Sequence, residues 1–239
     1  FFIINNNKKE EMNCSEYVLP IIEKSNYIQN MILYNKNDFN NLIIRNKPVW
    51  LLNLQGVEEN ELSPKMVEYL SEGEDRELVK RYKCSIRKRW FEVPNIKKGD
   101  ILFFRRYNRL PKLVVNTANV YSTDVSYNIK VFSGFDPLSV VFCFYNSITI
   151  TMCEYNGRFY GGGVCELVPS EFKSIKIPYK KIDISDVHKL DSMFRNNASI
   201  DEILDYVDEV TLSHCDFSEL SRIREIRNKY LSRRLFRIQ

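Results

Sequence analysis

The sequence has few of the residues that metal sites and hydrolytic active sites need. Its 239 residues include only two histidines, and no two of its six cysteines form a Cys-x-x-Cys pair. Zinc sites of the common spacings are therefore excluded, and no Ser-His-Asp or Cys-His pattern indicates a nucleophilic enzyme. A chain of this length folds without disulfides, so we expect reduced cysteines and a cytoplasmic location.

Long hydrophobic runs are also missing, and the pattern of the first residues does not predict a secretory leader. The longest apolar stretch, residues 137–153, is interrupted by polar residues such as Asn146 and Thr149, whereas a membrane span needs roughly 20 largely apolar residues. We therefore expect no membrane segment. With eight glycines, eight prolines, 44% apolar and 28% charged residues, the composition indicates a folded globular chain rather than a collagen-like or disordered one.

The first segment, residues 1–60, is rich in asparagine and irregular in pattern. We interpret it as a connector with local structure. Short helices are predicted over residues 16–24 and 38–45, and a buried strand over residues 49–52.

The second segment, residues 61–183, is predicted to be a strand-rich core. It opens with a helix that Ser63 caps and Pro64 begins; Gly73 is expected to interrupt it, and a second short helix is expected over residues 75–80. A buried helix is predicted over residues 137–155, with a pair of strands as the alternative. Shorter strands are predicted at residues 101–104, 113–115, 127–132, 159–160, 164–168 and 175–178, and a helical turn at residues 169–171.

The third segment, residues 184–239, is predicted to be helical, with Ser185 and Ser199 as N-caps. Its last helix, over residues 218–238, is amphipathic. The three segments together indicate the α+β class: a strand-rich core with flanking helices and a helical C-terminal part. The expected apolar side of the last helix comprises Leu220, Ile223, Ile226, Tyr230 and Leu231.

Charge is strongly segregated along the chain. Residues 76–112 carry 13 Lys or Arg against 3 Asp or Glu, residues 183–219 carry 2 against 10, and residues 221–239 carry 7 against 1. The overall net charge of +4 therefore conceals one basic and one acidic stretch.

The basic stretch places cations beside aromatic residues. Arg87-Lys88-Arg89-Trp90-Phe91 and Arg105-Arg106-Tyr107-Asn108-Arg109 are the two clusters. Lys and Arg neutralise phosphates, Arg and Asn bind base edges, and aromatic rings stack on bases. A solvated charged face is the alternative for a single short cluster, but two clusters in one segment favour nucleic-acid binding.

The glycine triplet Gly161-Gly162-Gly163 has two interpretations. One is a sharp bend between strands. The other is a close approach of backbone to a phosphate, which residues without a Cβ permit.

These motifs occur in a familiar order: residues 81–84, residues 87–94, Asp100-Ile101-Leu102, Thr123-Asp124 and residues 157–171. The chain resembles the C-terminal target-recognition region of class I adenine-specific DNA methyltransferases of the Taq-like and type IIG restriction-modification kind. In that family an Arg-x-x-Trp-Tyr strand and a segment with a Gly-Gly-Gly turn before Leu-x-Pro-Ser-Glu recur. Phe91 replaces the usual Tyr, and Phe1 to Ile4 resembles the last strand of an upstream methyltransferase domain.

The resemblance implies a division of labour. The family's Phe-x-Gly-x-Gly loop for S-adenosylmethionine and its Asn-Pro-Pro-Tyr motif are absent. The resemblance therefore implies a non-catalytic fragment with no cofactor or metal residues of its own, joined to an upstream methyltransferase domain that flips out an adenine. Its expected partner is double-stranded DNA. The candidate DNA-binding residues are Arg87, Lys88, Arg89, Arg105, Arg106, Asn108, Arg109, Asn116, Tyr121, Asp124, Tyr127, Tyr160, Gly161, Gly162 and Gly163.

Two other functions remain open from the sequence. The acidic residues 183–219 are compatible with a protein-interaction module of a restriction or phage-defence assembly. The basic and aromatic strands are compatible with a single-stranded nucleic-acid binder.

Overall fold

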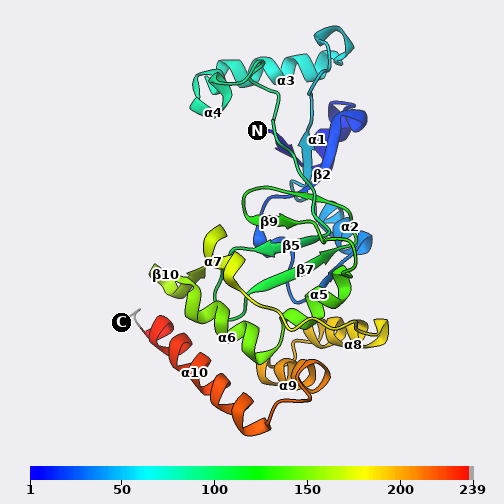
Figure 1. The fold of residues 1–239 in the computed structure, drawn as a ribbon. Helices are drawn as coiled ribbons and strands as arrows, with labels where there is room; N and C mark the ends of the chain where they lie inside the picture. Colours follow the sequence, from blue (N-terminus) through cyan, green and yellow to red (C-terminus); the bar gives the residue numbers. More distant parts are fainter. Residues whose placement is uncertain (237–239) are drawn as a thin grey trace. The chain divides into compact units, whose positions relative to one another are not determined.

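Three small sheets organise the computed structural model, which describes residues 1–236 (Figure 1). The contacts divide the chain into two units. Unit 1 comprises residues 1–27, 35–98 and 118–123, and unit 2 comprises residues 28–34, 99–117 and 124–239. The α+β class expected from the sequence is confirmed, whereas the three-segment division stays a prediction.

Unit 1 is built on a four-stranded sheet in the order β1-β4-β2-β8. β4 (Trp50–Leu52) lies between β1 (Ile3–Ile4) and β2 (Val18–Ile22), antiparallel to both, and β2 pairs in parallel with β8 (Tyr121–Ser122). The strand expected at residues 49–52 is confirmed. The helix expected over residues 16–24 is wrong, because a single turn at Ser15–Tyr17 leads into β2, whose backbone pairs with partners distant in sequence.

Four helices of unit 1 accompany this sheet: α1 (Asn6–Glu11), α2 (Lys36–Ile44), α3 (Pro64–Asp75) and α4 (Tyr82–Ser85). α2 begins earlier than expected because Asn35 caps it, with Asp38 completing a capping box. Ser63 caps α3 and Pro64 is its first residue, as predicted.

Gly73 does not interrupt α3, contrary to expectation. The helix continues through it because the missing side chain makes room for Trp90: a Cβ at Gly73 would lie 2.3 Å from Trp90 Cη2. The second helix expected over residues 75–80 is only a single 3-10 turn, Leu78–Lys80. The core of unit 1 gathers around Trp90, Leu52, Met66 and Leu70.

Unit 2 contains the other two sheets. The first has the order β3-β7-β5-β9 and the second the order β10-β11-β6. The strands expected at residues 101–104 and 113–115 are confirmed. The strand expected at residues 127–132 ends earlier, at Ile129. The bounds are β3 (Leu33–Tyr34), β5 (Ile101–Phe104), β6 (Arg106–Tyr107), β7 (Lys112–Asn116), β9 (Ser126–Ile129), β10 (Arg158–Tyr160) and β11 (Val164–Glu166).

The long apolar segment is helical, so the strand-pair alternative is wrong. It forms two helices rather than one, α5 (Pro137–Phe144) and α6 (Ser147–Asn156). Asn146 separates them, because its side-chain oxygen accepts the N–H of Thr149 at 2.9 Å and caps α6. α7 (Pro169–Ser174) follows β11 as expected, but residues 175–178 form no strand, since the Lys176 carbonyl accepts from the Thr149 hydroxyl instead of from a neighbouring strand.

The helical C-terminal part is confirmed up to residue 236 as α8 (Ile184–Arg195), α9 (Ile200–Thr211) and α10 (Phe217–Phe236). The end of the expected last helix, residues 237–238, lies outside the described residues. Asp183 rather than Ser185 caps α8, and Ser199 caps α9 as expected. α10 runs alongside α6 (Figure 1). No helix within residues 1–236 is long and apolar enough to cross a membrane.

Candidate nucleic-acid interface

The sheet β10-β11-β6 carries two exposed candidate residues, Arg106 and Tyr160. Arg158 and Arg106 both lie opposite Glu166, so these three side chains share one side of the sheet. Tyr160, two residues after Arg158, is 48% exposed, and the Arg106 guanidinium lies 5.9 Å from its ring centroid. We call this surface, with the adjoining exposed residues Asn108, Arg109, Gly161 and Gly162, the β10 face.

Acidic partners hold two of these arginines in place. Arg106 Nε lies 3.0 Å from Glu166 Oε2, and the Arg158 guanidinium donates to Glu171. Burial alone would raise the pKa of Glu171, but the bonds from Arg158 and from the Val168 N–H bring that pKa below its ordinary value. Arg106 and Arg158 are therefore oriented guanidinium groups rather than unpaired charges.

The glycine turn, Gly161–Gly163, closes the hairpin between β10 and β11. Gly162 has φ +73° and Gly163 has φ +68°, a conformation that favours glycine. A Cβ at Gly161 or Gly162 would meet nothing within 4 Å. Both sequence interpretations therefore fit the geometry, since the bend needs glycine and the backbone is open to a ligand.

Residues 108 and 109 follow β6 and lie beside the glycine turn. The Asn108 side chain donates to the Gly163 carbonyl at 3.1 Å, and both Asn108 and Arg109 are exposed. Sequence reasoning missed the groups behind this loop: Arg234 and Arg227 of α10, which are buried. The helix was expected to turn Ile226 inward, but Ile226 is 46% exposed because arginines that bind backbone carbonyls occupy the inner side.

Three other candidates of unit 2 make contacts within the fold. Arg105 Nε lies 3.4 Å from Glu166 Oε1 and its Nη2 lies 4.0 Å from Asp124, whose side chain is exposed. The Tyr127 hydroxyl donates to the Leu167 carbonyl at 3.0 Å. Burial is the main reason why the pKa of Tyr127 is raised.

Asn116 lies in the core rather than on a surface. It is 8% exposed, and its side chain donates to the Gly99 carbonyl at 3.0 Å. A base reader has to reach solvent, so the proposed interface omits Asn116.

The remaining candidates, Arg87, Lys88, Arg89 and Tyr121, belong to unit 1. The strand that the resemblance implies for residues 87–91 does not form. Turns replace it because contacts three residues apart close the backbone: Arg87 donates to the Trp90 carbonyl at 2.9 Å, and Arg89 pairs with Glu92. Trp90 is buried in the core of unit 1.

Lys88 is the exposed cation of this turn. It contributes to a hollow of about 630 Å³ on unit 1. Tyr121 is half-buried, with the Lys98 ammonium 5.4 Å from its ring centroid. The hollow is lined by Gln55, Gly56, Lys83, Ile86, Arg87, Lys88, Glu92 and Pro94.

Neither a metal site nor a cofactor loop emerges from this arrangement. Within residues 1–236, no group of three His, Cys, Asp or Glu side chains is placed to hold a metal ion. The glycine turn joins two antiparallel strands, whereas a dinucleotide-type glycine loop joins a strand to a helix. These residues therefore do not fit an S-adenosylmethionine loop.

A family model and a relative of known class both identify type II methyltransferases as similar to this chain. The family model for the C-terminal domain of type II methyltransferase M.Eco57I matches residues 1–212. Type II methyltransferase M.AccI from Acinetobacter calcoaceticus is 25% identical over 224 residues, which is 88% of this chain and 40% of that protein. The chain thus spans less than half of this relative's length.

Two solved structures are similar in fold. The type IIG restriction endonuclease BpuSI gives a TM-score of 0.63 at 15% identity, over 98% of this chain and 28% of that one. The type IIL restriction-modification enzyme MmeI gives a TM-score of 0.47 at 14% identity, over 100% of this chain and 31% of that one, which supports no argument. The family model defines the class as a C-terminal domain of type II methyltransferases. Within that class, the chain belongs to the family of the M.Eco57I methyltransferase C-terminal domain.

Proposed function

We propose that this chain recognises the target sequence in double-stranded DNA for a site-specific adenine methyltransferase. Membership of the type II methyltransferase family supports the reaction class. Methyl transfer from S-adenosylmethionine and extrusion of the adenine belong to a methyltransferase domain of the same protein, because this chain has neither of the motifs for those steps.

The observation that carries the proposal is the β10 face. Arg106 and Arg109 offer guanidinium groups that bind phosphate or the O6 and N7 atoms of guanine. Gly161 and Gly162 leave backbone open to a phosphate, and the half-exposed Tyr160 ring adds a stacking surface. One small sheet thus combines phosphate contact with base-edge chemistry.

The test is fluorescence anisotropy of the 239-residue chain with a random-sequence duplex, at salt concentrations from low to physiological. We expect binding that weakens steeply with salt as counterions are released. The double variant Arg106→Ala/Arg109→Ala should make the negative slope of log K against log salt shallower by about 2. The matched control is Lys189→Ala/Lys180→Ala, which removes two exposed cations outside the β10 face.

Two results would contradict the proposal. One is a folded chain that does not bind duplex at low salt. The other is a slope that changes equally in the β10-face variant and in the control. Competition with single-stranded DNA separates the duplex function from the single-strand alternative, since a single-strand binder would release the duplex.

A further inference from the structure

Arg234 and Glu154 form an ion pair in the interior of unit 2. Arg234 Nη2 lies 2.7 Å from Glu154 Oε1, and both side chains are 0% exposed. Burial raises the pKa of Glu154, and the Arg234 guanidinium opposes that rise. A buried ion pair stabilises a fold little more than an apolar pair of the same size does. The other hydrogen bonds of Arg234 therefore indicate its role better than its pairing with Glu154 does.

The remaining donors of Arg234 bind backbone. The guanidinium donates to the Gly163 carbonyl and to the Asn108 carbonyl, the latter at 2.5 Å. Arg227, two helical turns earlier in α10 and 3% exposed, donates to the Arg109 carbonyl at 3.0 Å. Two arginines of one helix thus hold three carbonyls in two segments that lie far apart in sequence.

These carbonyls belong to the β10 face. Residues 108 and 109 present the Asn108 and Arg109 side chains, and Gly163 ends the glycine turn. Glycines in the left-handed region are free to adopt other conformations, so the turn needs external bonds to keep one geometry. A planar guanidinium supplies several donors in a fixed fork, which a lysine ammonium cannot reproduce.

We propose that Arg234 and Arg227 are positioning residues for sequence discrimination, and that α10 is the support of the β10 face. The inference rests on the proposed DNA-recognition function and adds to it, because α10 lies beyond residues 1–212 that the family model matches. The side chains do not touch DNA. They fix the backbone from which the contacting groups project.

The first experiment compares Arg234→Lys with Arg233→Lys, a control at the adjacent exposed arginine. A duplex selected from a random library on the wild-type chain is measured against a scrambled duplex. We expect Arg234→Lys to lower the ratio of the two affinities about tenfold or more, with the salt slope of the scrambled duplex unchanged. Arg233→Lys should leave the ratio within about twofold of wild type. A folded Arg234→Lys chain with the wild-type ratio would overturn the inference.

A second variant covers the case in which Arg234→Lys does not fold. Arg234→Met/Glu154→Met removes both buried charges and retains apolar volume, yet leaves the carbonyls of Gly163 and Asn108 without the guanidinium. It should also lose discrimination, and a wild-type ratio would count against the inference.

Hydrogen exchange gives a measure that needs no DNA. Amides of the peptide that spans residues 160–164 should exchange faster in either variant at position 234 than in Arg233→Lys. Unchanged exchange in a folded variant would refute the positioning role even if the chain bound no DNA. Conversely, a wild-type chain that binds all duplexes equally, with exchange altered as expected, would refute only the proposed function.

Discussion

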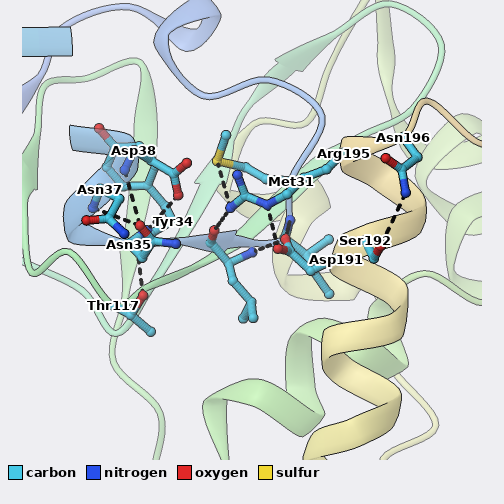
Figure 2. Close-up of polar contacts among 12 residues, drawn as sticks. Met31, Tyr34, Asn35, Asn37, Asp38, Thr117, Asp191, Ser192, Arg195 and Asn196 are labelled. Carbon is cyan, nitrogen blue, oxygen red and sulfur yellow. Dashed lines mark hydrogen bonds and ion pairs between the residues drawn. The ribbon is translucent and has the colours of Figure 1, made fainter. Parts of the chain in front are cut away.

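Asp191 and Arg195 lie one turn apart in α8 and act together on β3. Arg195 Nε donates to Asp191 Oδ2 at 2.7 Å, while Asp191 Oδ1 accepts the N–H groups of Ile32 and Leu33 at 2.8 and 2.9 Å (Figure 2). Arg195 also donates to the Leu33 carbonyl at 2.8 Å. The short strand is therefore fixed by side chains of a helix as well as by its pairing with β7.

Replacing Asp191 by alanine should destabilise the fold. Two backbone N–H groups would lose their acceptor and Arg195 its carboxylate, which together cost about 3 kcal/mol. Urea unfolding followed by circular dichroism measures the change. His188→Ala, an exposed change on the same helix, should stay within about 0.5 kcal/mol of wild type. Equal effects of the two substitutions would show that the Asp191 contacts contribute nothing.

Gly73→Ala should also be destabilising, although alanine is the better helix former. The new methyl group would lie 2.3 Å from Trp90 and 2.7 Å from the Phe1 ring, which is too close for carbon atoms. Overpacking of this kind costs about 1–3 kcal/mol. The thermal midpoint should therefore fall. Ser71→Ala, at an exposed position of α3, is the control and should leave the midpoint unchanged or slightly higher. A stabilised Gly73→Ala chain would mean that Trp90 has room to move.

Lys88→Ala and Arg89→Ala should separate binding from stability. Arg89 pairs with Glu92 and donates to the Val57 carbonyl at 2.6 Å, so its loss should lower the thermal midpoint. Lys88 is exposed, so its loss should leave the midpoint unchanged and lower the salt slope of duplex binding by about 1. If Arg89→Ala instead changed the salt slope and Lys88→Ala lowered the thermal midpoint, Arg89 would be identified as the residue in contact with DNA.

The free energy of unfolding should depend on pH in the alkaline range because Lys112 is largely buried. Burial lowers the pKa of its ammonium group from 10.5 to about 8. Between these values the folded chain has released the proton and the unfolded chain still holds it, so this lysine makes the fold more stable as pH rises. Relative to Lys112→Met, the wild-type free energy of unfolding should rise by up to about 3 kcal/mol from about pH 7.5 to about pH 10.5. A constant difference between the two chains in urea titrations would contradict this.

Local patterns predicted the parts of the fold that depend on neighbours in sequence. The Ser63-Pro64 cap, the apolar run at residues 101–104 and the glycine hairpin all have their cause within a few residues. Strand β2 does not, because its partners β4 and β8 come about 30 and 100 residues later. Pattern alone therefore left residues 16–24 open to a helical interpretation.

The candidate site, too, was predicted only where its residues have a signal in the local sequence. Composition located Arg106, Arg109 and the glycine triplet, since charge and missing side chains are visible in the sequence. It gave no means of distinguishing the buried Asn116 from the exposed Asn108. Hydropathy also placed Ile226 inside. It gave no indication that Arg234 is buried, because the carbonyls that bind Arg234 belong to residues at least 71 positions away.

The division of the chain into two units has a consequence for protein engineering. Each unit is assembled from three separated segments, and the backbone passes five times from one unit to the other. No single cut therefore separates the two units from each other. If the proposed function holds, a chimera that exchanges DNA specificity between relatives has to transplant the entire stretch as one cassette, with its last helix included, rather than graft a single hairpin.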